Sequence, residues 1–585
     1  ATVDGPSADI ASSQSVAVDV APDGTAAIAY LKGAGVYVSQ LVNGAWSTGQ
    51  RVDNLATGHA ERPDVAVSNG GKIVVVFLNR TDMNPAGIYA VVKPAGQPFP
   101  SGAAPLLLPG LTGDNVQVQI APNGDGYAAF TASAGQIRAA QLTGTTWAPV
   151  GGGLMTADGI LNSDPTHAAG DSMHEPRVAT NGNGSSAVVA WGEYDAAMVS
   201  QVFARRLTGT DKGPAPARAD LDSFGGADGT GKNADQLDIA SDAAGNAWVG
   251  FRDNFAYGAT DKGRAILRRF VGTAFEPAQL ADALGDPPPE SIEFPRLAVN
   301  AAGQGLMGAY RQMTHSTHAA ALDGSIWAPL GDINVTPNPG AAFSVPAIAE
   351  SGNGLVAWVG ADGLVRARVR GNGSLGGEIV LSQPAAGASD VFNLQATADQ
   401  QNFAVVAFPQ GPNGGARIVA AVVDLPRQPT GGGAGGGGAP DTLAPTVSRV
   451  RLSRRTFAVG RARTPVAAKL RTGTTISYSL SEAAGVRFKI ERTLPGRRSG
   501  GRCRKPTKRL RKHRRCTRYR TAGTLRRSGA AGANRLAFSG RIGRRALKRG
   551  PYRLTVAAKD AAGNASKAKR ANFRIVRAPK RRGRG

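Results

Sequence analysis

Residues 63–77 read PDVAVSNGGKIVVVF, and this phrase decides the fold of the larger part of the chain. Its first half alternates apolar and polar residues, a turn rich in Asn and Gly follows, and a continuously apolar run ends in Phe77. Alternation predicts a strand with one buried face, and an unbroken apolar run predicts a strand buried on both faces. The pair Asn69-Gly70 favours a tight turn between them. The phrase therefore predicts a β-hairpin.

Copies of this phrase recur through the first 425 residues, eight in all, with their last residues 47 to 61 positions apart. In most copies a third strand follows, and several then end in a turn with tryptophan. Three to four strands in about 50 residues is the period of a propeller blade. We therefore expect an all-β chain with a β-propeller over 1–425, of eight blades, or seven if one copy is degenerate. Each copy ends in an aromatic residue that we expect to pack between blades, namely Tyr30, Phe77, Phe130, Trp191, Phe251, Tyr310, Trp358 or Phe408.

The N-terminal segment indicates how such a ring closes. The sequence of residues 1–18 resembles that of residues 51–67 in register. In 51–67, the start of the segment is predicted to be the outer strand of one blade, and the chain then leads into the next copy. No earlier blade exists for the first segment. We therefore expect residues 1–5 to complete the last blade, whose own chain ends near Leu425, which removes exposed sheet edges.

The repeats resemble the sialidase-like repeats of exported bacterial β-propellers. The Asp-box of that family, Ser-x-Asp-x-Gly-x-Thr-Trp, survives here as Gly-x-x-Trp, as in Gly144-Thr-Thr-Trp147. The resemblance implies the fold far more than an activity, because one fold hosts many functions.

A glycine run, GGGAGGGG at 431–438, marks a flexible linker that we place at 426–444. Beyond it, short β patterns predict a basic β-sandwich over 445–577, followed by a basic tail at 578–585. SYSLSEAAGVRFKI, GPYRLTVAAKDAAGN and FRIV resemble bacterial immunoglobulin-like (fibronectin III-like) modules, and Tyr552 stands where a tyrosine corner would sit. The expected strands are 447–452, 474–480, 486–492, 517–525, 534–539, 552–559 and 571–576.

The net charge of +26 is divided sharply along the chain. Residues 440–585 hold 43 Lys/Arg and 4 Asp/Glu, whereas 1–439 hold 25 and 38. The basic part should therefore seek anionic partners, with an affinity that falls as salt rises.

Several features predict a secreted protein, extracellular or associated with the cell surface. The only cysteines, Cys503 and Cys516, predict a disulfide and so an oxidising compartment. The sequence contains no run of 18 apolar residues, so we predict no transmembrane segment. The chain begins at Ala1, which we interpret as a mature form without its signal peptide.

The segment between the cysteines, RKPTKRLRKHRR, is the strongest functional signal. Such local charge predicts an anion-binding loop for cell-wall polymer, acidic polysaccharide, lipid head groups or, without sequence specificity, nucleic acid. The alternative is a solvated surface that is rich in Arg because the genome is GC-rich. The predicted anion-binding residues are Arg504, Lys505, Lys508, Arg509, Arg511, Lys512, Arg514 and Arg515.

A second candidate site lies near the propeller axis. Arg177 and Arg296 occupy equivalent positions in two copies, each shortly after an acidic residue, Glu175 or Glu293. Sialidase chemistry requires a third arginine and a Tyr/Glu nucleophile pair, and we identify neither in the sequence. We therefore predict no catalytic residue, no metal site and no cofactor.

These observations predict a secreted, non-enzymatic binding or adhesion protein. Its basic domain would attach to anionic cell-envelope or matrix polymers, and its propeller would bind a glycan or a protein. One alternative is a sialidase-like glycoside hydrolase. The other is an extracellular structural protein that self-associates through its oppositely charged parts.

Overall fold

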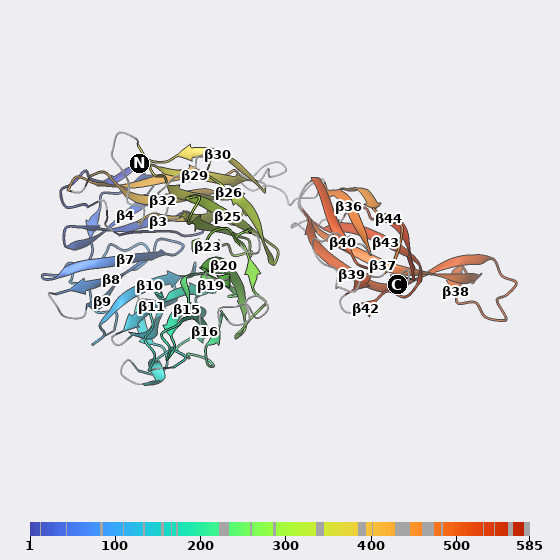
Figure 1. The fold of residues 1–585 in the computed structure, drawn as a ribbon, viewed down its shortest axis with the longest axis horizontal. Helices are drawn as coiled ribbons and strands as arrows, with labels where there is room; N and C mark the ends of the chain where they lie inside the picture. The colour runs from blue at the N-terminus through green and yellow to red at the C-terminus, as the bar shows by residue number, and fades with distance from the viewer. Residues whose placement is uncertain are drawn as a thin grey trace. The chain divides into compact units, whose positions relative to one another are not determined.

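A computed structural model shows an almost entirely β chain that divides into two compact units, Ala1–Thr430 and Gly431–Gly585 (Figure 1). A short 3-10 turn at Ala157–Gly159 interrupts the strands. In the part of the chain that is described, no helix is long and apolar enough to cross a membrane. The structure describes all residues except 12, 14, 43, 82–85, 109, 133–134, 154–156, 165, 171–173, 221–232, 258–259, 285–287, 335–343, 372, 384–392, 400–401, 413, 427–444, 459–472, 481–483, 530–531, 543–544, 560–565 and 578–585.

The first unit is a β-propeller whose described residues form eight antiparallel sheets. The first four sheets in chain order are β2 (Val16–Val20), β3 (Ala26–Lys32), β4 (Gly35–Val42), β5 (Ala45–Trp46) and β6 (Gln50–Arg51); β7 (His59–Val67), β8 (Ile73–Arg80) and β9 (Gly87–Lys93); β10 (Gly113–Ile120), β11 (Gly126–Ala132), β12 (Gln136–Thr143) and β13 (Thr146–Pro149); and β14 (Arg177–Thr180), β15 (Ser186–Tyr194), β16 (Ser200–Thr208) and β17 (Ala217–Arg218).

The remaining four sheets continue the pattern. They are β18 (Ala234–Ser241), β19 (Ala247–Tyr257), β20 (Thr260–Val271), β21 (Ala274–Phe275) and β22 (Gln279–Leu280); β23 (Ile292–Val299), β24 (Gly305–Arg311), β25 (Ser316–Asp323) and β26 (Ile326–Asp332); β27 (Ser344–Ile348), β28 (Gly354–Val359), β29 (Val365–Gly371) and β30 (Ser374–Val380); and β31 (Gln395–Ala398), β32 (Phe403–Gln410), β33 (Arg417–Asp424) and β1 (Thr2–Asp4). This count covers the described residues, so the blade number stays a prediction.

The sheets form a closed ring. The first strand of each sheet contacts the first strand of the next, from β2 through β7, β10, β14, β18, β23 and β27 to β31, which contacts β2 again. The N-terminal strand β1 pairs with β33, with Thr2 opposite Val419 and Asp4 opposite Ile418. The prediction that residues 1–5 complete the last sheet is confirmed.

The first seven hairpins in chain order use one kind of turn. At Ala121 the carbonyl accepts the N–H of Gly124 (2.8 Å), and Gly124 is left-handed with a φ of 92°. The equivalent residue in the last hairpin is Asn402, with a φ of 70°. The left-handed residue thus precedes the second strand, as in a turn with a following bulge. The pairs Asn181-Gly182 and Asn353-Gly354 predict a left-handed residue at Gly182 and Gly354, but the structure places it at Gly184 and Gly352.

The aromatic residues at the ends of the copies are packing residues. Seven of the eight side chains are fully buried, and the eighth, Tyr310, is partly exposed and its hydroxyl contacts Nδ1 of His315. Filling the space between sheets with these rings removes large apolar areas from water.

The second unit contains two main sheets in its described residues. One is β34 (Val447–Leu452), β36 (Thr474–Leu480) and β40 (Gly532–Phe538). The other is β35 (Thr456–Ala458), β44 (Lys569–Val576), β43 (Gly550–Lys559), β37 (Ala484–Ser499), β38 (Arg502–Arg504) and β39 (Arg515–Gly529). A small pair is formed by β41 (Arg541–Ile542) and β42 (Arg545–Ala546).

These two sheets share one core and so form a sandwich. Ile476 and Phe538 from the first sheet pack with Phe488 and Phe573 from the second. The Tyr552 hydroxyl donates to the carbonyl of Lys548 (2.6 Å), the contact that a tyrosine corner makes. The immunoglobulin-like assignment itself stays a prediction.

Six of the seven strands predicted here lie within observed strands, and the seventh, 534–539, runs one residue past the end of β40 at Phe538. The largest differences are in β37 and β39, which are longer than predicted. The structure extends β37 to Ser499 and begins β39 at Arg515, where we had expected a loop. The limits 1–425 and 445–577 stay predictions. The predicted linker at 426–444, apart from Pro426, and the tail at 578–585 lie outside the described residues.

Removing residues 1–5 should lower the melting temperature of the propeller by about 5 °C, because it unpairs β33 and exposes the apolar surface that Val3 covers. Calorimetry measures the shift. Asp4→Asn is the control, since it keeps the strand and removes only the negative charge that pairs with Lys32 (3.0 Å) and accepts from the Tyr30 hydroxyl (2.7 Å); it should have a smaller effect. An unchanged melting temperature after the deletion would show that β1 does not hold the ring.

Candidate functional site

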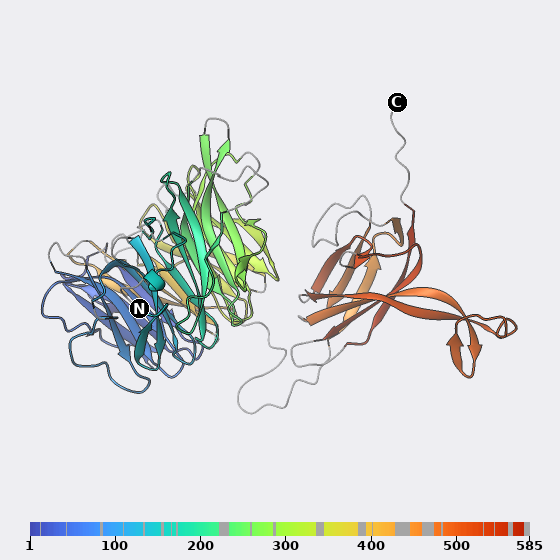
Figure 2. The same cartoon turned by 90° about the horizontal axis from the view of Figure 1, so that it is seen from below.

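Strands β37 and β39 form a two-stranded ribbon that continues beyond the sandwich. The neighbouring strand β43 pairs with β37 only as far as Tyr552, opposite Arg492. From Thr493 onward β37 pairs with β39 alone, and near its end also with β38. Seven further residues at about 3.4 Å each make a projection of roughly 24 Å. Figure 1, in which β38 is labelled, and Figure 2 both show this ribbon extending away from the rest of its unit. We call residues 493–521 the arm.

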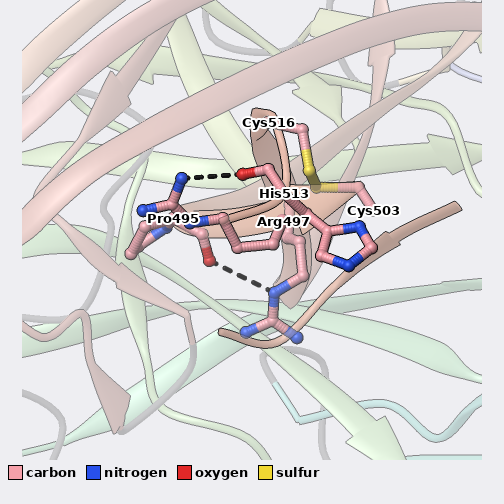
Figure 3. The surroundings of a disulfide bond; sticks show 6 residues. Pro495, Arg497, Cys503, His513 and Cys516 are labelled. Atoms are coloured by element: carbon pink, nitrogen blue, oxygen red, sulfur yellow. Dashed lines mark hydrogen bonds between the residues drawn. A yellow bond between two sulfur atoms is a disulfide. The ribbon is translucent and has the colours of Figure 1, made fainter. Parts of the chain in front are cut away.

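A disulfide between Cys503 and Cys516 closes the tip of the arm, as predicted (Figure 3). The two Cα atoms are 6.0 Å apart, an ordinary separation for such a bond. Cys516 lies opposite Gly496 in the ribbon, and Cys503 lies opposite Arg498. A Cβ atom on Gly496 would collide with the Cys503 sulfur, so only glycine leaves room for the bond at this position.

Backbone contacts order the segment beyond the disulfide. Arg497 donates from its guanidinium to the carbonyl of His513 (2.8 Å), and the N–H of Arg498 donates to the carbonyl of Arg514 (2.9 Å). Inside the loop, the His513 N–H donates to the carbonyl of Leu510 (3.0 Å). The loop therefore has a defined turn and does not depend on its cationic side chains for internal bonds.

The eight predicted anion-binding residues are brought together on this tip, and all are exposed. The arm holds thirteen Lys/Arg, and the sequence contains no Asp or Glu between Glu491 and Asp560. None of the eight forms an ion pair with a described residue, since the nearest acid in the chain, Glu491, pairs with Lys489 (2.8 Å) and Arg553 (2.7 Å). The arm therefore presents its positive charge to solvent.

Like charges at this density repel one another. Two cations about 7 Å apart, the spacing of alternate residues on a strand, cost roughly 0.6 kcal/mol in water. Salt screens this repulsion within about 8–10 Å. A polyanion relieves it directly, because each cation then faces an opposite charge.

The axis residues behave differently, because they are paired within the protein. Glu175 accepts from Arg177 (3.2 Å) and also from Arg62 of β7 (2.5 Å). Arg62 also contacts the Asn115 side chain of β10, so it connects the first strands of two sheets with the segment that precedes β14. It is left-handed (φ 49°) and lies in a bulge of β7.

Glu293 does not pair with Arg296. It accepts from Arg252 (3.0 Å), which also binds Asp235 (2.6 Å). Arg296 donates to the carbonyl of Leu237 (3.2 Å), and burial, with the nearby charge of Arg177, lowers its pKa. The charge of Arg177 thus acts on Arg296, and of the two acids only Glu175 pairs with the arginine that follows it.

Two carboxylates that sequence reasoning missed link neighbouring first strands. Asp19 accepts from the N–H of Val67 (2.7 Å), and Asp64 accepts from the N–H of Val118 (2.8 Å). Desolvation in the ring raises the pKa of each to about 6. An acid on an otherwise apolar strand, as in VAVDV, was the available signal.

Within the described residues, no three His, Cys, Asp or Glu side chains gather as a metal site. The prediction that no metal or cofactor binds stays a prediction.

Comparisons with known proteins give fold neighbours only. No family model matches this chain, and no curated protein matches it. Among solved structures, an α-L-arabinanase of Penicillium chrysogenum is 11% identical with a TM-score of 0.35, covering 72% of this chain and 97% of its own. An ulvan lyase is 14% identical with a TM-score of 0.38, covering 62% and 92%. The fucose-recognising lectin of Aleuria aurantia, a six-bladed β-propeller, is 13% identical with a TM-score of 0.28, covering 52% and 92%. At these scores the likenesses carry no argument about function.

Asp19→Asn should raise the melting temperature at pH 8 by a few degrees and leave it nearly unchanged at pH 4. The raised pKa means that the folded state holds the proton more tightly than the unfolded chain, so this contribution to stability is present below about pH 4 and lost as the pH rises through about 6. Asparagine stays neutral and can still accept from Val67. Asp9→Asn, at an exposed site, is the control. An equal change in melting temperature at pH 4 and pH 8 would contradict a raised pKa for Asp19.

Replacing Cys503 and Cys516 together by serine should lower the hydrogen-exchange protection of the Arg498 amide by about tenfold or more, because a ribbon outside a core is only marginally stable. The amide of Val556, in the sandwich core, serves as the internal control and should keep its protection. Unchanged protection at Arg498 would mean that the strands hold the arm without the bond.

Proposed function

We propose that this is a secreted binding or adhesion protein whose arm attaches it to anionic polymers of a cell envelope or matrix. One observation carries the proposal. Eight exposed cations lie on a tip that a disulfide closes, and none of them forms an ion pair with a described residue. The disulfide supports an oxidising compartment and therefore export.

Binding of this kind is driven by charge and by release of counterions. The arm offers a line of guanidinium and ammonium groups without an aromatic residue between Cys503 and Cys516. Such a surface discriminates poorly among polyanions. We therefore expect it to bind several of them, with affinities set by charge density and salt.

The propeller, in this proposal, presents its surface to a glycan or protein partner. Arg177 and Arg252 each face a carboxylate of the protein itself, which supports a structural role for these arginines over capture of a substrate carboxylate. For this reason we favour binding over the sialidase-like hydrolase alternative.

The test neutralises four arm cations, Lys505, Lys508, Arg509 and Arg511, by substitution with glutamine. The matched control neutralises four exposed cations of the same unit, Lys559, Lys567, Lys569 and Arg570. For duplex DNA as the probe, the slope of log Kd against log salt concentration should become shallower by about 3.6 in the arm variant, since each of the four cations contributes about 0.9. The control variant should change it by less than about 1.

Two outcomes would count against the proposal. Equal losses in the two variants would show that net charge, not the arm, determines binding. Unchanged polymer binding together with loss of self-association in the arm variant, followed by sedimentation, would favour the structural, self-assembling alternative.

A further inference from the structure

A groove of about 440 Å³ lies at the base of the arm, where the ribbon leaves the sheet. Beyond Arg492, β37 loses its pairing with β43, and the groove occupies the fork between them. Its volume falls within the ~300–1,000 Å³ of small-molecule sites. The groove residues that matter here are Arg455, Thr493, Thr517, Tyr519, Asn572 and Arg574.

Tyr519 gives this groove an aromatic platform. The ring is 45% exposed, which is unusual for an aromatic side chain of this protein. The guanidinium of Arg553 lies 3.3 Å from the ring centroid, over one face. Arg553 is itself fixed by two hydrogen bonds to Oε2 of Glu491 (2.7 and 3.1 Å), and Glu491 is buried. The ring is thus held in place from one side while much of its surface stays open to solvent.

Two arginines supply positive charge beside the platform. The N–H of Arg574 donates to the carbonyl of Arg455 (2.7 Å), so the two side chains start from adjacent backbone positions. Both side chains are exposed, neither forms an ion pair with a described residue, and no acidic residue lines the groove. Guanidinium groups bind carboxylates through paired hydrogen bonds.

Neutral hydrogen-bonding groups complete the lining. Thr493, Thr517 and Asn572, which offer hydroxyl and amide groups, line the groove together with the platform and the arginines. A sugar ring needs this combination, since it has an apolar C–H face and a rim of hydroxyls. A sugar that also carries a carboxylate matches the arginines as well.

We propose that the groove binds an acidic sugar residue of a polysaccharide, with its carboxylate on Arg455 and Arg574 and its C–H face on Tyr519. This inference rests on the proposed attachment to anionic polymers and narrows their class to acidic polysaccharides. The arm then supplies charge without selectivity, and the groove at its base selects the sugar.

The probe is trigalacturonate, titrated into the full chain by calorimetry. Tyr519→Ala should weaken its binding by about tenfold, and Tyr519→Phe should stay within about twofold because the platform remains. Arg574→Gln should weaken binding by about tenfold through the lost charged hydrogen bonds. Lys569→Gln removes the same charge from the same strand, outside the groove, and should leave binding unchanged. Melting temperatures confirm that each variant is folded.

Duplex DNA separates this inference from the proposed function. Tyr519→Ala should leave the affinity for DNA unchanged. The four-cation arm variant should bind DNA more weakly and keep most of its affinity for trigalacturonate. Equal trigalacturonate affinities for the wild type and Tyr519→Ala would overturn the proposal that the groove binds the sugar. An equal loss for DNA and trigalacturonate in Tyr519→Ala would also overturn it, because the site would then accept nucleotides. An arm variant that binds DNA like the wild type would overturn the proposed function and leave the groove standing.

Discussion

The disulfide between Cys503 and Cys516 is the constraint on which the functional part of the molecule depends. A two-stranded ribbon without a core beneath it is marginally stable in water, and thirteen cations on the arm weaken it further. The bond fixes the two strands where the repulsion is greatest, and Gly496 provides the space for it. The display of charge at the tip and the fork at the base both follow from a ribbon that keeps its register.

Arginine plays opposite roles in the two units. In the propeller, Arg252 pairs with Asp235 and Glu293, and Arg62 pairs with Glu175 and contacts the Asn115 side chain, so each arginine connects separate segments of the ring. In the arm the same residue type forms no ion pair with a described acid, and its charge faces solvent. The location of carboxylates, more than the number of arginines, therefore separates the structural cations from those that can bind a partner. Burial in the ring also disfavours the charged form of Asp19 and Asp64, and it raises the pKa of each to about 6.

Local pattern was sufficient to predict the propeller hairpins, the role of β1 and seven of the strands of the second unit, because each depends on alternation and turn chemistry within a short window. The short strands β35, β38, β41 and β42 were missed. The extension of β37 and β39 was missed, because Pro495, Gly496 and a run of cations are typical of a loop. A strand with an open edge tolerates that proline. The groove could not be predicted at all, since Tyr519 and Arg574 lie on different strands and meet only through sheet pairing. The propeller-axis and anion-binding assignments remain predictions.

Chemical footprinting of lysines in the polymer complex tests the central claim most directly. Lys505, Lys508 and Lys512 lie on the tip of the arm, whereas Lys559, Lys567 and Lys569 are exposed elsewhere in the same unit. With polygalacturonate bound, we predict that acylation of the three arm lysines slows by several-fold and that the other three keep their rates. Uniform protection of all six lysines, or protection confined to the second set, would contradict the account.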